Sequence, residues 1–224
     1  MPELWVPWAV RIPGPDWKFG YSYTEAERYH HKRGFTCHSS EGYISSDIEV
    51  IKGPRQTSFQ LEGAKSGALY QFYPLTADCW HSGDADDDGG VAGNIDTIGY
   101  EMEGFAGEAL TEGQYQTLLK TYRWCASEFL WPAPAIYPWN GAPGEWAAAT
   151  LFPHQRIADK YTACPSGRWP LEKLIRDLRG EPVPDQLTAE LYVHRVRVAI
   201  IKAIAEGRFE DAARAMKVYL GINV

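Results

Sequence analysis

A strand pattern that leads directly into a capped helix restricts the fold of this chain more than any other feature. Residues 97–103 alternate between apolar and polar side chains, which predicts a β-strand. Thr111 and Gln114 have the spacing of a capping box. Apolar residues then recur at helical spacing in residues 115–125, and the helix should end near Leu130, before the prolines that follow. A strand followed by an amphipathic helix predicts a layered α/β structure.

Shorter patterns predict further strands and helices along the chain. Runs of β-branched and apolar residues predict strands at 34–38, 57–61 and 68–73, the last two joined as a hairpin by a glycine-rich turn. Helices are expected at 45–51 and 171–178, each followed by a glycine. Residues 1–33 and 132–150 have loop-like compositions. Mixed strands and helices over residues 1–180 therefore predict one α/β domain.

The last part of the chain has a different character. Glu181-Pro182-Val183-Pro184 has the composition of a linker, and residues 188–205 and 209–220 have the pattern of two amphipathic helices around Gly207. We therefore expect a domain at 1–180, followed at 181–224 by a linker and a C-terminal helical hairpin. The hairpin is interpreted either as a helical cap on the domain or as a wall-binding or oligomerisation element.

Charge and hydropathy exclude several classes of function. The net charge is -7 over 224 residues, which disfavours a nucleic-acid partner because phosphate binding needs a concentrated basic face. No apolar run approaches the roughly 18–20 residues needed to cross a bilayer. The N-terminus is acidic and interrupted by proline, unlike a secretory signal, so synthesis in the cytoplasm without a signal peptide is expected. The four cysteines are scattered and show no Cys-x-x-Cys pair, which makes a disulfide framework or zinc ribbon improbable.

Two separate segments contain candidate metal ligands. His38 ends the strand predicted at 34–38, and a lone histidine in that place has little specificity. His154 and Cys164 lie on either side of one loop further along the chain. Imidazole nitrogen and thiolate sulfur are good zinc ligands, and three protein ligands with one open position are typical of a catalytic site. From local spacing alone, a buried thiol explains Cys164 equally well.

Four ordered motifs resemble those of the zinc-dependent N-acetylmuramoyl-L-alanine amidases, which share their fold with peptidoglycan recognition proteins and many bacteriophage endolysins. Residues 34–42 resemble the strand that carries the first zinc histidine of the family, and residues 79–83 resemble its Trp-His-Ala-Gly loop. Residues 98–104 match its Ile-Gly-Ile-Glu strand, and residues 154–165 match the segment with the other two ligands. The resemblance implies a central mixed β-sheet flanked by helices.

The resemblance also implies roles for individual residues. Zn²⁺ would be held by His38, His154 and Cys164. Glu101 would be the general base on the attacking water and the later proton donor to the leaving amine. From the strand pattern alone, Glu101 is simply a strand carboxylate. Thr162 would lie near the developing oxyanion, where the family has Lys or Thr.

Two residues of the Trp-His-Ser-Gly loop are the expected contacts to substrate. Trp80 and His81 are predicted to line the cleft, with a purely structural role as the alternative for His81. The family's histidine near Phe59 and Gln60 is missing, which alters that part of the cleft.

The function implied is hydrolysis of the amide between N-acetylmuramic acid and L-alanine in peptidoglycan, by a bacteriophage endolysin that acts on the cell wall of the host. A bacterial muropeptide-recycling amidase is one alternative. A non-catalytic peptidoglycan-binding module of the same fold is another, although such receptors typically lose a zinc ligand and this chain keeps all three.

Overall fold

The computed structural model describes residues 3–24, 27, 31–83, 92–138, 148–158 and 160–180. In this part of the chain, eight strands form a main sheet and a small two-stranded sheet. They are β1 (Val10–Arg11), β2 (Phe19–Gly20), β3 (Gly34–Cys37), β4 (Leu61–Gly63), β5 (Leu69–Gln71), β6 (Asp78–Cys79), β7 (Thr97–Met102) and β8 (Leu151–Pro153).

The main sheet is mixed, with the strand order β1-β5-β4-β7-β3-β8. The pairs β4–β7, β7–β3 and β3–β8 are parallel, whereas β4 and β5 form an antiparallel hairpin. The carboxyl ends of the four parallel strands β4, β7, β3 and β8 therefore meet at one edge of the sheet. We call it the carboxyl edge. Strands β2 and β6 pair separately and antiparallel.

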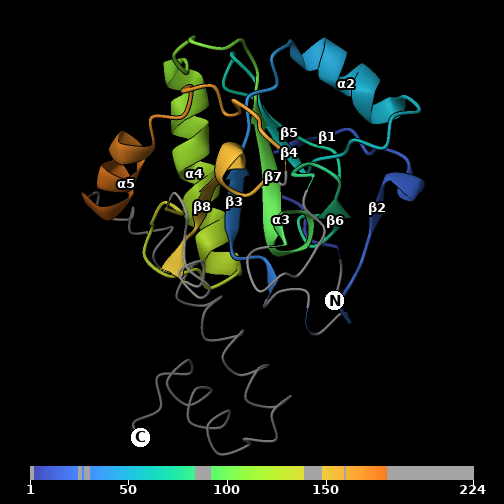
Figure 1. The fold of residues 1–224 in the computed structure, drawn as a ribbon, viewed down its shortest axis with the longest axis horizontal. Helices are drawn as coiled ribbons and strands as arrows, with labels where there is room; N and C mark the ends of the chain where they lie inside the picture. The colour runs from blue at the N-terminus through green and yellow to red at the C-terminus, as the bar shows by residue number, and fades with distance from the viewer. Residues whose placement is uncertain are drawn as a thin grey trace, which may run out of the picture.

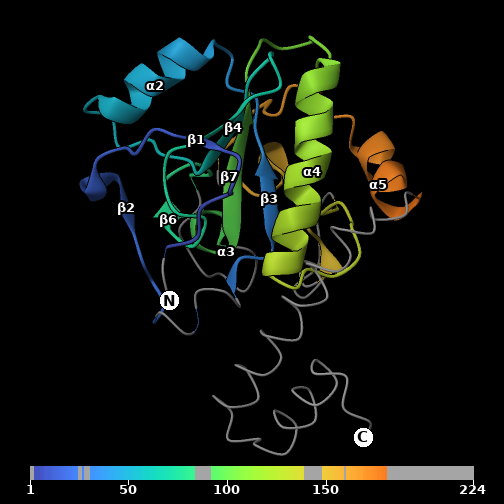
Figure 2. The same ribbon diagram turned by 180° about the vertical axis from the view of Figure 1, so that it is seen from behind.

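Helices cover both faces of the main sheet (Figures 1 and 2). On one side are α4 (Glu112–Glu128) and α5 (Leu171–Gly180), and on the other is α2 (Ile44–Lys52). Three single-turn helices complete the described elements: η1 (Asp16–Lys18), α3 (Gly93–Asp96) and η3 (His154–Arg156).

The largest core cluster lies between the sheet and α4. Phe35, Leu61 and Tyr100 point from three strands onto Leu118 and Tyr122 of the helix, and all five are buried. Because successive side chains of a strand point to opposite faces, the next residues, Thr36, Glu62 and Glu101, face the other side of the sheet. A smaller cluster that includes Ile51 of α2 and Phe72 covers part of that second face. The second face is therefore only partly filled by apolar side chains, and it carries the polar residues considered below.

The expected α/β architecture, a central mixed sheet flanked by helices, is confirmed. The capping box is present, since Thr111 accepts a hydrogen bond from the Gln114 N–H at 3.1 Å. The hairpin is confirmed with a shifted first strand: β4 covers residues 61–63 rather than 57–61. Ser58 and Gln60, which precede β4, hydrogen-bond through their side chains to Lys18 and Ala77.

Residues 1–33 and 132–150 were predicted as loops, but their described parts contain some regular secondary structure. The first range contains β1, η1 and β2, and a bridge joins Ile136 to Leu151 of β8. The predicted C-terminal hairpin lies outside the described residues, as does the segment 139–147 of the second loop. None of the described helices has both the length and the apolar composition of a membrane-spanning segment.

Candidate metal centre

The sheet register brings His38 and His154 together. Cys37 of β3 pairs with Pro153 of β8 in a parallel register, so the next residue of each strand emerges at the same level of the carboxyl edge. The two imidazole rings lie 4.4 Å apart between centroids. Because β3 also pairs with β7, His38 is level with Glu101, and its N–H bonds to the carbonyl of Tyr100.

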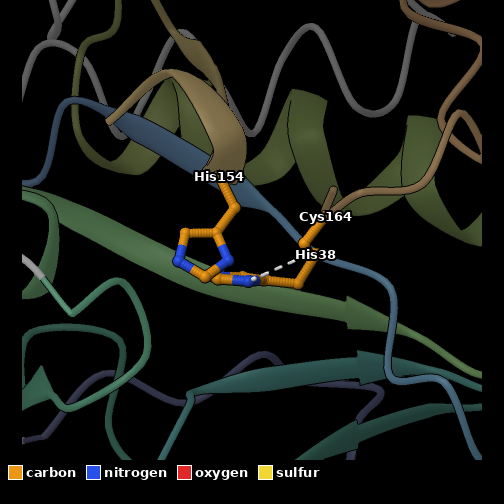
Figure 3. A group of neighbouring side chains, drawn as sticks. All are labelled: His38, His154 and Cys164. Atoms are coloured by element: carbon orange, nitrogen blue, oxygen red, sulfur yellow. Dashed lines mark hydrogen bonds between the residues drawn. The ribbon is translucent and has the colours of Figure 1, made fainter. Parts of the chain in front are cut away.

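Cys164 completes a cluster of three donors. One ligand atom each from His38, His154 and Cys164 lie within 4.8 Å of one another (Figure 3). The Cys164 Sγ lies 3.6 Å from His38 Nδ1 and accepts a hydrogen bond from the Ser39 N–H at 3.3 Å. The loop that carries Cys164 is anchored to η3, because the N–H of Gln155 donates to the Cys164 carbonyl.

The partners of the two histidines fix which ring nitrogens face the cluster. His154 Nε2 lies 2.9 Å from the Ser82 carbonyl, which can only accept, so this nitrogen carries the proton. His154 Nδ1 is then a lone-pair donor, and it is buried without a hydrogen-bond partner in the described residues. His38 directs Nδ1 toward Cys164 and Nε2 toward His81 Nδ1, 3.1 Å away.

Burial sets the charge of these groups. It lowers the pKa of His154, and together with the neighbouring imidazoles it lowers the pKa of His38 well below its usual range. Both rings are therefore neutral, as ligands must be. Burial raises the pKa of the Cys164 thiol to about 12, so a thiolate there needs a cation beside it. Two neutral imidazoles and a thiol are a donor set that fits a zinc ion. One of these donors, His154 Nδ1, is buried without a hydrogen-bond partner in the described residues.

Glu101 is the carboxylate next to this cluster. Its Oε1 lies 3.8 Å from His38 Nδ1, and its side chain is only 14% exposed. Its Oε2 is buried without a hydrogen-bond partner in the described part of the chain. Burial, followed by the charges of Asp47 and Glu41, raises the pKa of Glu101 well above its usual range. The position predicted for a general base is thus occupied by a carboxyl group beside the cluster.

Thr162 lines an adjacent cavity of about 280 Å³. Its Oγ1 accepts a hydrogen bond from the Cys164 N–H at 3.2 Å. The described lining of this cavity consists of Ser82, Gly83, His154, Ala158, Lys160, Tyr161 and Thr162. The cavity therefore reaches the metal centre at His154.

The two residues predicted to line the cleft, Trp80 and His81, have other contacts in the structure. His81 is 9% exposed, and it faces His38 rather than the cavity. Trp80 is half-buried, and its backbone is hydrogen-bonded to Ser58. Neither residue belongs to the described lining of the cavity.

Many members of the resembled family carry a histidine where Phe59 and Gln60 stand, and the Gln60 side chain here makes hydrogen bonds within the protein. Its amide donates to the Ala77 carbonyl and accepts from the Gly99 N–H, both at 2.7 Å. The His81 ring packs directly against Gly99, because a Cβ at this position would lie only 2.7 Å from the ring. Gln60 thus supports the sheet beneath the cluster without entering it.

Three supporting residues were not identified from the sequence. Asn94 accepts hydrogen bonds from the backbone N–H groups of both His81 and Ser82, which fixes that loop. Trp169 donates its indole N–H to the His38 carbonyl at 2.8 Å. Ser39 contacts the Cys164 sulfur through its backbone N–H, and the sequence contains no signal for that contact.

Fold and site together define an α/β protein with a candidate three-donor metal centre at the carboxyl edge of a mixed sheet. The family profile of N-acetylmuramoyl-L-alanine amidase matches residues 21–167, and the chain belongs to this family. It is therefore an enzyme of the N-acetylmuramoyl-L-alanine amidase class, whose substrate is peptidoglycan.

Solved structures share the fold. AmpD is 18% identical with a TM-score of 0.57, over 80% of this chain and 98% of that one. PlyL is 17% identical with a TM-score of 0.55, over 78% and 99%. The endolysin N-acetylmuramoyl-L-alanine amidase LysCS from Clostridium intestinale is 16% identical with a TM-score of 0.53, over 78% and 97%. A comparison with curated proteins gave no match.

Proposed function

We propose that the chain is a zinc-dependent hydrolase of the amide between N-acetylmuramic acid and L-alanine, with His38, His154 and Cys164 as the zinc ligands. The observation that carries this proposal is the convergence of the three ligand atoms within 4.8 Å, one of them a buried and unpartnered imidazole nitrogen. Zinc is a Lewis acid that polarises carbonyl groups and lowers the pKa of water.

The chain's own residues supply the proton transfers. Glu101 accepts a proton from the attacking water and returns it to the leaving amine, because an amide nitrogen leaves poorly until it is protonated. Its position beside His38, with Oε2 free of partners in the described residues, supports this role.

Thr162 stabilises the negative charge that develops on the carbonyl oxygen. The residue lines the cavity, and its hydroxyl accepts from the Cys164 N–H and keeps its own proton for donation. A hydroxyl replaces the lysine cation found in other members of the family, so the contribution is that of a neutral hydrogen bond.

The zinc requirement is tested by removing and restoring the metal. The purified protein is treated with a chelator and then given zinc, and release of L-alanine amino termini is followed on purified peptidoglycan. Activity should vanish and return in the wild type, whereas His154→Ala should not recover. A wild type that binds peptidoglycan without turnover at saturating zinc would instead indicate a binding module.

We further propose that this enzyme is a bacteriophage endolysin that degrades the cell wall of a host. The fold shared with the endolysin LysCS supports this assignment. The test compares kcat/KM on intact sacculi with kcat/KM on soluble muropeptides, and an endolysin should prefer the sacculi. Activity confined to soluble muropeptides would contradict the assignment and indicate a recycling amidase.

A further inference from the structure

Two exposed aromatic rings lie against each other at the carboxyl edge. Tyr43, the residue before α2, and Phe105, in the loop after β7, form an edge-to-face pair with centroids 5.4 Å apart. They are 56% and 38% exposed. The Lys65 ammonium lies 5.8 Å from the first ring and 5.9 Å from the second. We call these three residues the aromatic platform.

The backbone on both sides of the platform is held rigidly. Gly42 and Gly104 exchange hydrogen bonds of 3.2 and 2.9 Å, which ties the two loops together. The N–H of Phe105 donates to Glu108, and the N–H of Ala106 donates to Glu41 at 2.8 Å. The rings are therefore exposed although their backbones are fixed.

The same network connects the platform to the metal centre. Glu103, two residues after Glu101, accepts hydrogen bonds from the backbone N–H groups of Ile44 and Lys65 at 3.4 and 2.6 Å. Glu41 also accepts from the hydroxyl of Ser39, whose N–H contacts Cys164. The segments that carry the proposed base and ligands thus also position the platform.

Exposed aromatic rings on a preorganised backbone are typical of a recognition surface, because the rings offer apolar area at little entropic cost. The charges favour a neutral ligand. Lys65 forms a 2.7 Å ion pair with Glu108, so its charge is compensated, and the carboxylates of Glu41 and Glu103 lie in the loops beneath. An anionic stem peptide would gain little here, whereas a pyranose ring has apolar C–H faces that pack on aromatic rings.

We propose that the aromatic platform binds N-acetylhexosamine rings of a glycan strand. This inference rests on the proposed function in one respect: the proposed function identifies the glycan as the glycan strand of peptidoglycan. The platform would hold the polymer beside the metal centre, while Glu101 and the ligands act on the amide.

Binding of a β-1,4-linked N-acetylglucosamine tetramer to the full chain tests the proposal directly by NMR titration. The wild type should bind the tetramer, and the double variant Tyr43→Ala/Phe105→Ala should bind about tenfold more weakly. The double variant Tyr43→Phe/Phe105→Tyr keeps both rings and should retain binding, which separates loss of the rings from loss of the fold. Trp17→Ala is the matched control, since that ring is 57% exposed and outside the platform.

A wild type that ignores the tetramer, an alanine double variant that binds it equally well, or a free stem peptide that competes for the same site would overturn the proposal. Measuring alanine release from sacculi distinguishes failure of the glycan-binding proposal from failure of the proposed amidase function. The alanine double variant should raise KM about tenfold and leave kcat within about twofold. A wild type that binds the tetramer but releases no alanine would support the glycan site and contradict the amidase proposal.

Discussion

At the scale of single residues, each candidate ligand makes a polar contact to a second group that orients it. His81 faces the far nitrogen of His38, the Ser82 carbonyl holds the far nitrogen of His154, and the Ser39 N–H contacts the Cys164 sulfur. Such outer contacts fix the tautomer and ring orientation of metal ligands. His154 Nδ1 is then the ring nitrogen left without a hydrogen-bond partner among the described residues.

His81→Ala should weaken zinc binding, because His38 Nε2 loses the group that fixes its tautomer. The expected loss in zinc affinity is about 10- to 100-fold. It is measured by competition with a chromophoric chelator, and His31→Ala, a histidine outside the cluster, serves as the control. If the two variants bound zinc equally well, His81 would have no part in orienting the ligand.

Glu101→Ala should abolish turnover and keep the metal. The side chain lies beside the cluster without being one of its three donors. Loss of a general base reduces kcat by roughly 10²- to 10⁴-fold. Zinc content by elemental analysis and alanine release from peptidoglycan are measured on the same preparation. Near-normal activity would remove Glu101 from the mechanism.

The site residues could be predicted from the sequence only in part. His38, His154 and Cys164 were selected by motif, and the structure brings them together. The position of His81 behind His38 could not be predicted, because it depends on the packing of the 79–83 loop against Gly99, which has no local sequence pattern.

At the scale of elements, the β4–β7 pair carries two buried carboxyls on one face. Glu62 and Glu101 are directly paired in the parallel register. Glu62 is fully buried, and burial together with the Asp47 carboxylate raises its pKa to about 11. Asp47 belongs to helix α2.

Glu62→Gln should therefore stabilise the protein at alkaline pH. The folded-state pKa lies above the unfolded value, so wild-type stability falls as pH rises above about 4.3, and glutamine has no proton to lose. The stability difference between variant and wild type should grow from pH 5 to pH 9, by at most about 1.4 kcal/mol per pH unit. Urea unfolding at several pH values measures it, with the exposed Glu112→Gln as control. A difference that does not change with pH would show that Glu62 is ionised in the folded protein.

Thr111→Ala should destabilise the fold by about 1 kcal/mol, because it removes the cap of α4. The Thr111 hydroxyl accepts from Gln114 and also donates to the Lys65 carbonyl at 2.8 Å. Urea unfolding gives the loss, and Thr111→Ser, which keeps the hydroxyl, should recover most of it. An unchanged free energy of unfolding in the alanine variant would contradict the capping role.

The long helix α4 was predictable, whereas β8 and the two-residue strands were not. The α4 helix has both a cap and a periodic apolar face, so its local sequence is sufficient. Strand β8 has only three residues, and its place in the sheet depends on pairing with β3, more than a hundred residues earlier. The strands β1, β2 and β6 have two residues each, too few to establish an alternation.

At the scale of the whole molecule, the metal centre joins distant parts of the chain. Its ligands follow β3, follow β8 and lie in the loop before α5, so a bound ion cross-links segments more than a hundred residues apart. A ligand that binds only the folded state stabilises it by mass action.

Chelation should therefore lower the melting temperature of the wild type, and added zinc should restore it. Cys164→Ala, which loses one donor, should show a much smaller shift. Differential scanning calorimetry measures both proteins in the same buffers. Equal melting temperatures with and without chelator in the wild type would indicate that no ion is held in the cluster.

The central claim is that this fold and cluster cleave the amide between muramic acid and L-alanine. The most direct measurement is digestion of purified peptidoglycan, in which new L-alanine amino termini and new reducing sugar ends are scored with and without a chelator. We predict new alanine termini that disappear with the chelator, and no increase in reducing ends. New reducing ends without alanine termini would mean glycosidase chemistry and would contradict the account.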